Sequence, residues 1–123
     1  MEELYQEFII ELYKNPRNKG TIDNPDLKAQ LYNKSCGDAI TLFIKAENGT
    51  ITEAKFMGQG CAISMASSSL FTGFLKGKKV DGLGKITKED ALSLIKIDLS
   101  KNPSRMKCAL LPFEALKKAL RPE

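Results

Sequence analysis

The sequence predicts an α+β fold in which a small, largely antiparallel, three-stranded sheet is covered by helices. Three observations lead to this prediction. Apolar and polar residues alternate over residues 39–46, as they do in a half-buried strand. Asn48-Gly49 follows directly and accepts the positive φ angles of a type I′ turn, so it should fold the chain back into an antiparallel strand over residues 50–57. Segments with helical apolar spacing lie on either side of this hairpin.

The segment before the hairpin contains a helix, a loop and a weaker strand. Residues 2–14 place apolar side chains at helical spacing on one face and acidic ones opposite, which is typical of an amphipathic helix. Asn15-Pro16 ends this helix, because proline lacks an N–H for the preceding turn and restricts the residue before it. A polar loop follows, and residues 27–33 form the third predicted strand.

Three further helices are predicted after the hairpin. Residues 61–76 carry an apolar stripe that burial can stabilise despite the many serines in this segment. Thr87 begins a capped helix that runs to Ile95. Asn102-Pro103 supplies a cap and a proline at the first position of the last helix, whose apolar residues again recur at helical spacing.

Length and composition indicate one globular domain over residues 1–123. A chain of 123 residues buries roughly two-thirds of the surface that it exposes when unfolded, so it needs no disulfide to hold a core. Hydrophobic residues make up 42% and charged residues 28%, and no apolar run approaches the roughly 20 residues of a membrane span. The acidic start Met1-Glu2-Glu3 lacks the pattern of a signal peptide, so we expect a cytoplasmic location.

The charge distribution and the absence of histidine argue against several function classes. The chain carries 19 basic and 15 acidic residues, a net charge of +4. Its densest basic group, Lys76, Lys78 and Lys79, has no interleaved aromatic residues, so we expect a solvated surface and neither nucleic-acid nor membrane binding. The absence of histidine excludes Ser-His-Asp triads, HExxH zinc sites and imidazole bases within this chain.

Four residues are candidate metal ligands: Cys36, Asp38, Cys61 and Cys108. Three cysteines cannot all pair, and a reducing compartment keeps them as thiols, so metal or sulfur chemistry explains them better than disulfides do. Asp38 stands at the entry of the hairpin and Cys61 just past its exit, so the hairpin should make them neighbours. Cys61 would also lie at the positive end of a helix dipole, which favours its thiolate.

Three thiolates and one carboxylate match two kinds of metal site. They have the right number and type for tetrahedral zinc. They could equally hold a [2Fe–2S] cluster, in which each iron needs two protein ligands and the carboxylate is the unusual, most easily displaced donor. The alternative is that each cysteine is a small buried hydrophobic residue, and the spacings of 25 and 47 residues match no zinc-finger signature.

Arg105 is a further candidate, one helical turn before Cys108. A guanidinium there would favour the thiolate of Cys108 and could pair with Asp38 when no metal lies between them. The alternative is an ordinary surface arginine. Lys107 could act similarly, although a solvated lysine is the simpler interpretation.

Several separate motifs, in order, give the chain a resemblance to the NifU-like family, which includes the IscU scaffold proteins and the SufU proteins. The resemblance covers nearly the whole chain. It is carried by an opening-helix motif and three cysteine motifs: Tyr13-Lys14-Asn15-Pro16-Arg17-Asn18, Cys36-Gly37-Asp38, Gly58-Gln59-Gly60-Cys61-Ala62-Ile63-Ser64 with Ala66-Ser67-Ser68-Ser69, and Arg105-Met106-Lys107-Cys108-Ala109.

The resemblance implies the SufE/NifU-like α/β sandwich, with a surface site that takes zinc or a nascent iron–sulfur cluster. It also implies a cysteine desulfurase as partner, which passes a persulfide sulfur to a site cysteine. The residue that matches the usual acceptor is Cys108. Apo iron–sulfur proteins would then receive the finished cluster.

Two departures place the chain between the IscU and SufU types. IscU-type members usually have a histidine directly before the third cysteine and a Pro-Pro-Val-Lys motif nearby, whereas Lys107 stands here and the motif is absent. SufU proteins commonly carry an insertion between the second and third cysteines, and the 47-residue spacing is too short to contain it.

Three functional hypotheses follow. The first is a scaffold that builds a transient [2Fe–2S] cluster for apo-proteins, with Asp38 as the labile ligand and zinc holding the empty site. The second is a zinc-dependent sulfurtransferase, in which Cys108 leaves the zinc and accepts persulfide sulfur; only this second hypothesis makes the chain an enzyme. The third is a small protein with structural zinc, against which Gly37, Gly60 and the displaceable aspartate argue. A homo-oligomer that shares a cluster is an open alternative.

Overall fold

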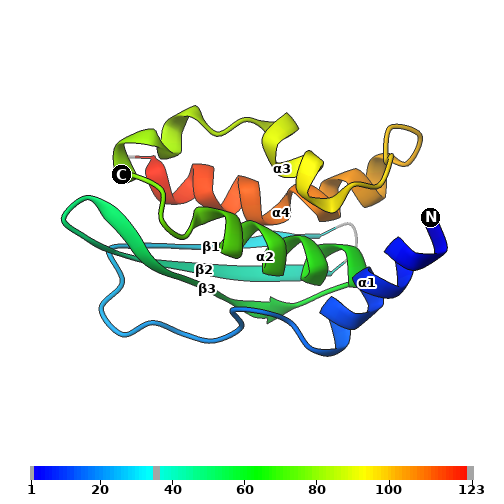
Figure 1. The fold of residues 1–123 in the computed structure, drawn as a ribbon, viewed down its shortest axis with the longest axis horizontal. Coiled ribbons are helices and arrows are strands. Elements are labelled where there is room, and N and C mark those ends of the chain that lie inside the picture. Colours follow the sequence, from blue (N-terminus) through cyan, green and yellow to red (C-terminus); the bar gives the residue numbers. More distant parts are fainter. Residues whose placement is uncertain (1, 35–36, 122–123) are drawn as a thin grey trace.

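A computed structural model of the chain describes residues 2–34 and 37–121, with side chains from residue 6 onward (Figure 1). The described part confirms the α+β class predicted from the sequence. In chain order the elements are α1 (Glu2–Lys14), β1 (Leu27–Asn33), β2 (Asp38–Glu47), β3 (Thr50–Gln59), α2 (Ala62–Leu75), the 3-10 helix η1 (Val80–Lys85), α3 (Lys88–Ile95) and α4 (Pro103–Leu120).

The three strands form one antiparallel sheet in the order β1-β2-β3. Asn48 and Gly49 turn the chain between β2 and β3 with φ angles of 52° and 78°, so the predicted hairpin is confirmed. Helices α2 and α4 lie side by side across one face of the sheet, with α2 against β3 and α4 against β1 and β2 (Figure 1). Helix α1 packs on α2, and α3 packs on both α2 and α4.

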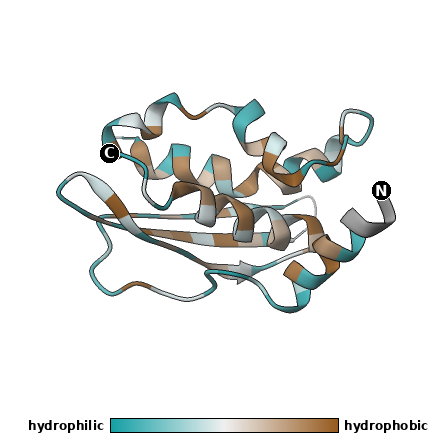
Figure 2. Cartoon of the chain, viewed as in Figure 1, coloured by the Kyte–Doolittle hydropathy of each residue, from teal (hydrophilic) through white to brown (hydrophobic). Residues whose placement is uncertain are grey.

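The main core lies between the sheet and the two covering helices. Strand β2 contributes Ile40, Leu42 and Ile44 at alternate positions, all fully buried. Phe71 of α2 meets Phe113 of α4 edge to face, with ring centroids 6.5 Å apart. Figure 2 shows apolar residues concentrated where these helices meet the sheet. Full burial of one such side chain stabilises the fold by about 1.5–3 kcal/mol, so this layer holds the helices on the sheet.

A second, smaller core joins the amino-terminal helix to the rest of the molecule. It contains Ile9 and Leu12 of α1, Ile63 of α2, Ile95 of α3 and Cys108 of α4. One of the candidate sulfur ligands is therefore also part of an apolar cluster on which four helices converge.

The buried hydroxyl groups of α2 bind the loop that follows α1. Ser69 Oγ accepts a hydrogen bond from the N–H of Arg17 at 3.1 Å, and the Asn18 side-chain amide donates to Thr72 Oγ1 at 3.2 Å. The N–H of Phe56 in β3 donates to the carbonyl of Asn18 at 3.0 Å. These contacts satisfy polar groups that would otherwise be buried at a cost, and they cover the outer edge of β3 with the loop.

The last two helices begin where the sequence predicts. Thr87 and Asp90 form a capping box, in which the side chain of each accepts the backbone N–H of the other. Asn102 caps α4 by accepting the N–H of Arg105 at 3.2 Å, and Pro103 is the first helical residue. Within residues 2–34 and 37–121, no helix is both long and apolar enough to cross a membrane.

Candidate metal centre

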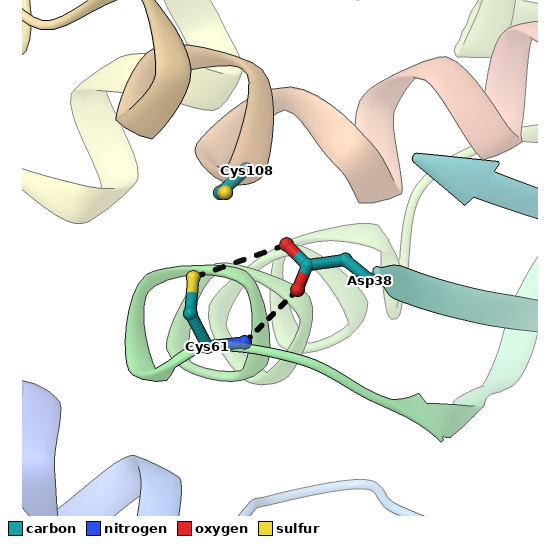
Figure 3. A group of neighbouring side chains, drawn as sticks. All are labelled: Asp38, Cys61 and Cys108. Atoms are coloured by element: carbon teal, nitrogen blue, oxygen red, sulfur yellow. Dashed lines mark hydrogen bonds between the residues drawn. The ribbon is translucent and has the colours of Figure 1, made fainter. Parts of the chain in front are cut away.

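The β2–β3 hairpin brings Asp38 and Cys61 together, as predicted. Ala39 pairs with Gln59, so Asp38 at the start of β2 lies beside the residues that leave β3. The N–H of Cys61 donates to Asp38 Oδ1 at 3.0 Å, and the thiol of Cys61 lies 3.8 Å from Asp38 Oδ2 (Figure 3). The two oxygens of one carboxylate thus serve different partners, a backbone amide and a thiol.

Cys61 is the N-cap residue of α2, with φ −72° and ψ 170°. Its own side chain forms no capping hydrogen bond, and the first turn of α2 contains no acidic residue. The Asp38 carboxylate therefore supplies from β2 the negative charge that a helix amino terminus favours, an effect of about 0.3–1 kcal/mol in exposed helices. The same carboxylate caps the helix and faces the sulfur.

Gly60 is required at this site because of how closely the carboxylate approaches its backbone. A Cβ atom at residue 60 would lie 2.6 Å from Asp38 Oδ1 and 2.4 Å from Ser64 Oγ. Both distances are shorter than real Cβ contacts, so any larger residue would push Asp38 or Ser64 away. This steric role of Gly60 was not predicted from the sequence.

Ser64 is a site residue that sequence reasoning did not single out. Its hydroxyl donates to the carbonyl of Cys61 at 3.0 Å and lies 3.8 Å from the thiol of Cys61, which donates to it. The side chain is fully buried. Its position three residues after a helix N-cap was the available signal, because residues three apart on a helix are neighbours.

Cys108 reaches the site from α4, which packs against α2. The hydroxyl of Ser67 in α2 donates to the carbonyl of Ala109, which holds the two helices together one residue from the sulfur. Cys108 is 3% exposed and Asp38 is 1% exposed, whereas Cys61 is only partly buried. Access to the site from solvent is therefore easiest at Cys61.

The ligand atoms of Asp38, Cys61 and Cys108 all lie within 4.8 Å of one another, so this group could hold a metal ion. A tetrahedral zinc ion with Zn–S bonds of about 2.3 Å separates its sulfur ligands by about 3.8 Å. The described donors would need to close around an ion by about 1 Å at most, so the chemistry and the spacing both suit a thiolate-binding metal. Cys36, the fourth predicted ligand, lies outside the described residues.

The two predicted cations are on the surface of α4. Arg105 is exposed in the first turn, one turn before Cys108, and its N–H is bound to the Asn102 cap. Lys107 is exposed next to Cys108 and lines a groove between α4 and β1. The role predicted for Arg105 toward Cys108 and Asp38 stays a prediction.

The fold and the site together define a class: small α+β domains with a cysteine- and aspartate-lined centre where a hairpin meets two helices. The NifU-like N terminal domain model matches residues 4–122. The chain therefore belongs to the NifU-like family, as the motifs predicted.

Individual relatives include both types within the family. The chain is 37% identical to the zinc-dependent sulfurtransferase SufU of Bacillus subtilis, covering 100% of this chain and 93% of the relative. It is 40% identical to the iron–sulfur cluster assembly enzyme IscU of Drosophila melanogaster, covering 95% and 76%. A crystal structure of FiSufU from Fervidobacterium islandicum AW-1, a scaffold candidate of the SUF system, superposes with a TM-score of 0.77 and 30% identity over 94% of this chain and 95% of that one.

Proposed function

We propose that this chain is a scaffold for iron–sulfur cluster assembly. On it, sulfur from a cysteine desulfurase and iron form a [2Fe–2S] cluster on Cys36, Asp38, Cys61 and Cys108, and the cluster then passes to apo-proteins. The observation that carries the proposal is the convergence of two thiols and a carboxylate from β2, α2 and α4 within 4.8 Å. Relatives named for cluster assembly support it.

The carboxylate gives such a site a means of release. Asp38 Oδ1 is held by the N–H of Cys61, so this oxygen stays in place whether or not a metal is present. Oδ2 faces the sulfur of Cys61 and would be the oxygen that binds iron. An oxygen donor binds a thiophilic ion more weakly than a thiolate does, so Asp38 is the ligand that leaves first.

Sulfur arrival at Cys108 needs an opening of the site. The Cys108 thiolate would attack the outer sulfur of the desulfurase persulfide; a new S–S bond forms on Cys108, the old S–S bond breaks, and the desulfurase cysteine leaves as a thiolate. This step is redox-neutral. Conversion of two sulfane sulfurs to sulfide takes four electrons: two ferrous ions supply two of them as they become ferric in the oxidised cluster, and an external thiol or protein reductant supplies the other two. Because Cys108 is 3% exposed, the partner must enter past Cys61 or separate α2 from α4.

Anaerobic reconstitution tests the scaffold. The chain is mixed with a cysteine desulfurase, cysteine, ferrous iron and a thiol reductant, and visible absorption is followed. We expect a [2Fe–2S] chromophore that transfers to an apo-ferredoxin. Strong stimulation of desulfurase turnover by the zinc-loaded chain, without any cluster, would reject the scaffold in favour of sulfur transfer.

Asp38 variants test the release point. Asp38→Ala removes the weak ligand, so the reconstituted cluster should live longer and transfer more slowly. Asp38→Asn is the matched variant, because its amide oxygen can still accept the N–H of Cys61. A longer lifetime in both variants supports release at Asp38, whereas lifetimes equal to that of the unsubstituted chain contradict it.

A zinc-dependent sulfurtransferase is the second candidate, favoured by the SufU relative of Bacillus subtilis. The same described donors would hold zinc, and release of Cys108 from the zinc would free the acceptor thiolate. A thiol-labelling assay after incubation with a persulfide-loaded desulfurase identifies the acceptor. Persulfide should appear in the Cys61→Ser variant and be absent in Cys108→Ser; the reverse pattern would identify the more exposed Cys61 as the acceptor.

A further inference from the structure

A groove of about 620 Å³ lies between α4 and the carboxyl-terminal end of β1, next to the candidate metal centre. One wall is a stripe of α4 and its C-cap residue, in which the groove residues are three or four positions apart except for the adjacent pair Leu110 and Leu111. The other wall is the end of β1 with the residue that follows it. From Lys107 to Arg121 the α4 wall is about 21 Å long, the length of six or seven extended residues. The lining residues are Leu31, Tyr32, Asn33, Lys34, Lys88, Lys107, Leu110, Leu111, Glu114, Lys118 and Arg121.

The rim of this groove is strongly basic. Among the described residues that line it, Glu114 is the single acid, against five cations. The cations come from three parts of the chain and border the groove along its length: Lys34, Lys88, Lys107, Lys118 and Arg121. The five cations and one acid give the described lining an excess of positive charge of 5 − 1 = +4. This excess equals the net charge of the entire chain, +4.

The floor of the groove is apolar. Leu110 and Leu111 are buried and Leu31 is half-buried, so their side chains form a base below the charged rim. Tyr32 adds a large ring that is 59% exposed. An apolar floor with a basic rim suits a ligand that has both acidic and apolar side chains.

The backbone of β1 also faces this groove. Strand β1 is an outer strand of the sheet, and Lys118 Nζ donates to the carbonyl of Gln30 at 2.7 Å. The backbone groups of a strand alternate in direction, so the groups of Tyr32 should point the same way as those of Gln30, away from β2. An extended chain lying in the groove could therefore hydrogen-bond to the strand edge.

We propose that this groove is a docking site for an extended acidic segment of a partner protein, with apolar side chains at alternate positions. The aliphatic side chains of the docked segment would contact the apolar floor of the groove, and its carboxylates would face the basic rim. Nucleic acid suits the groove less well, because Tyr32 is the one aromatic residue among the described residues of its lining and the floor is aliphatic.

The position of the groove links docking to the metal centre. Lys107 precedes Cys108 directly, and Asn33 of the β1 wall pairs with Asp38. A segment seated in the groove would therefore place the rest of its protein beside the sulfur ligands. This link to cluster or sulfur traffic rests on the proposed function, whereas docking in the groove does not.

The test uses an eight-residue synthetic peptide that alternates glutamate and leucine. Amide chemical shifts of the full chain, labelled with ¹⁵N, are followed by NMR during titration. We expect the largest shifts in residues 31–34 and 107–121, binding that weakens as salt rises, and no comparable shifts with a peptide that alternates lysine and leucine.

Two charge-reversal variants make the test specific. Lys88→Glu with Arg121→Glu reverses two rim cations whose side chains make no hydrogen bond within the described part of the chain, and we expect at least about tenfold weaker peptide binding. Lys85→Glu with Lys101→Glu changes the net charge equally at exposed positions outside the groove and should bind as before. Equal weakening in both pairs, shifts centred elsewhere, or stronger shifts with a ten-nucleotide oligothymidine at the same residues would overturn the proposal. Zinc binding by the unsubstituted chain tests the metal centre of the proposed function and does not depend on the groove. Failure of the proposed function and failure of peptide docking can therefore be told apart.

Discussion

The two halves of the candidate metal centre are held in different ways. In the hairpin half, Asp38 and Cys61 are 23 residues apart in the sequence and lie at the same end of the paired strands β2 and β3. The N–H of Cys61 donates a hydrogen bond of 3.0 Å directly to the Asp38 carboxylate. In the helix half, Cys108 comes from α4, 47 residues after Cys61, and is placed by helix packing. The hairpin half therefore depends on local backbone geometry, whereas the helix half depends on the tertiary core.

This difference has a functional consequence. Backbone hydrogen bonds hold the hairpin half, so we expect its geometry to change little when a metal binds. Packed helices can separate by small shifts, so the helix half is the part that could open for a partner. Substitutions directed at each half should therefore separate stability from metal affinity.

The largest expected effect concerns the packing that holds the helix half. Phe71→Ala removes a ring that is 1% exposed and contacts Phe113 of α4, so the free energy of unfolding should fall by about 3–5 kcal/mol. Chemical denaturation measures it. Phe74→Ala, the same deletion at a half-buried position of the same helix, should cost clearly less. Equal losses would show that α2–α4 packing is not the main support.

A substitution at Gly60 should damage the hairpin half with less effect on stability. Gly60→Ala places a Cβ 2.6 Å from Asp38 Oδ1, so the carboxylate must move and zinc affinity should fall by about 10–100-fold. Competition with a chelator measures the affinity. Gly82→Ala is the control, because a Cβ at Gly82 meets nothing within 4 Å. Unchanged affinity in Gly60→Ala would mean that Asp38 is no ligand.

The turn of the hairpin should affect stability alone. Gly49 has φ 78°, so Gly49→Ala should cost about 1–2 kcal/mol of folding stability. The ten-residue strands β2 and β3 hold the register at the other end, where Asp38 lies, so zinc affinity should stay within about twofold. Gly84→Ala, where the added Cβ meets open space, is the control for thermal unfolding. A parallel loss of affinity would show that the site depends on the whole hairpin.

The smallest expected effect is at the contact between α2 and α4 next to Cys108. Ser67→Ala removes the hydrogen bond to the Ala109 carbonyl and should cost about 1 kcal/mol of stability. A small loss of zinc affinity should accompany it, because the bond lies one residue from the sulfur. Ser93→Ala deletes a similar hydroxyl, bound to the Asp90 carbonyl at an exposed position of α3, and should leave affinity unchanged. Isothermal titration of zinc into both variants compares them.

Features with a local cause were the ones that could be predicted. The Asn48-Gly49 turn, the Thr87 capping box and the Asn102-Pro103 helix start each depend on a few adjacent residues, and each is confirmed. The neighbourhood of Asp38 and Cys61 followed from the hairpin alone. The approach of the carboxylate to Gly60 could not be predicted, because it depends on the distance between two backbone segments.

The hydrogen-bond partners of most of the α2 serines also could not be predicted from the sequence. The helical propensity of these serines is poor, and the sequence predicts only that burial of the apolar stripe stabilises the helix despite them. In the structure Ser64 faces Cys61, Ser67 binds Ala109 of α4, and Ser69 binds the backbone of Arg17 after α1. The partner of Ser64 lies three residues away in the same segment, whereas the partners of Ser67 and Ser69 come from α4 and from the loop after α1. No pattern within residues 61–76 encodes the last two partners.

By itself the sequence determined the strands, the α-helices, the hairpin and the kinds of ligand available, because turn chemistry, caps and side-chain identity are local properties. Its motifs also determined the family. The 3-10 helix η1 (Val80–Lys85) was not predicted, since the sequence indicated only a glycine- and lysine-rich connection there. Only the tertiary structure decided that Cys108 lies within 4.8 Å of Asp38 and Cys61 and that basic residues from three segments surround one apolar groove. The physical reason is that these distances depend on how α4 packs against α2 and β1, and packing depends on the whole buried core.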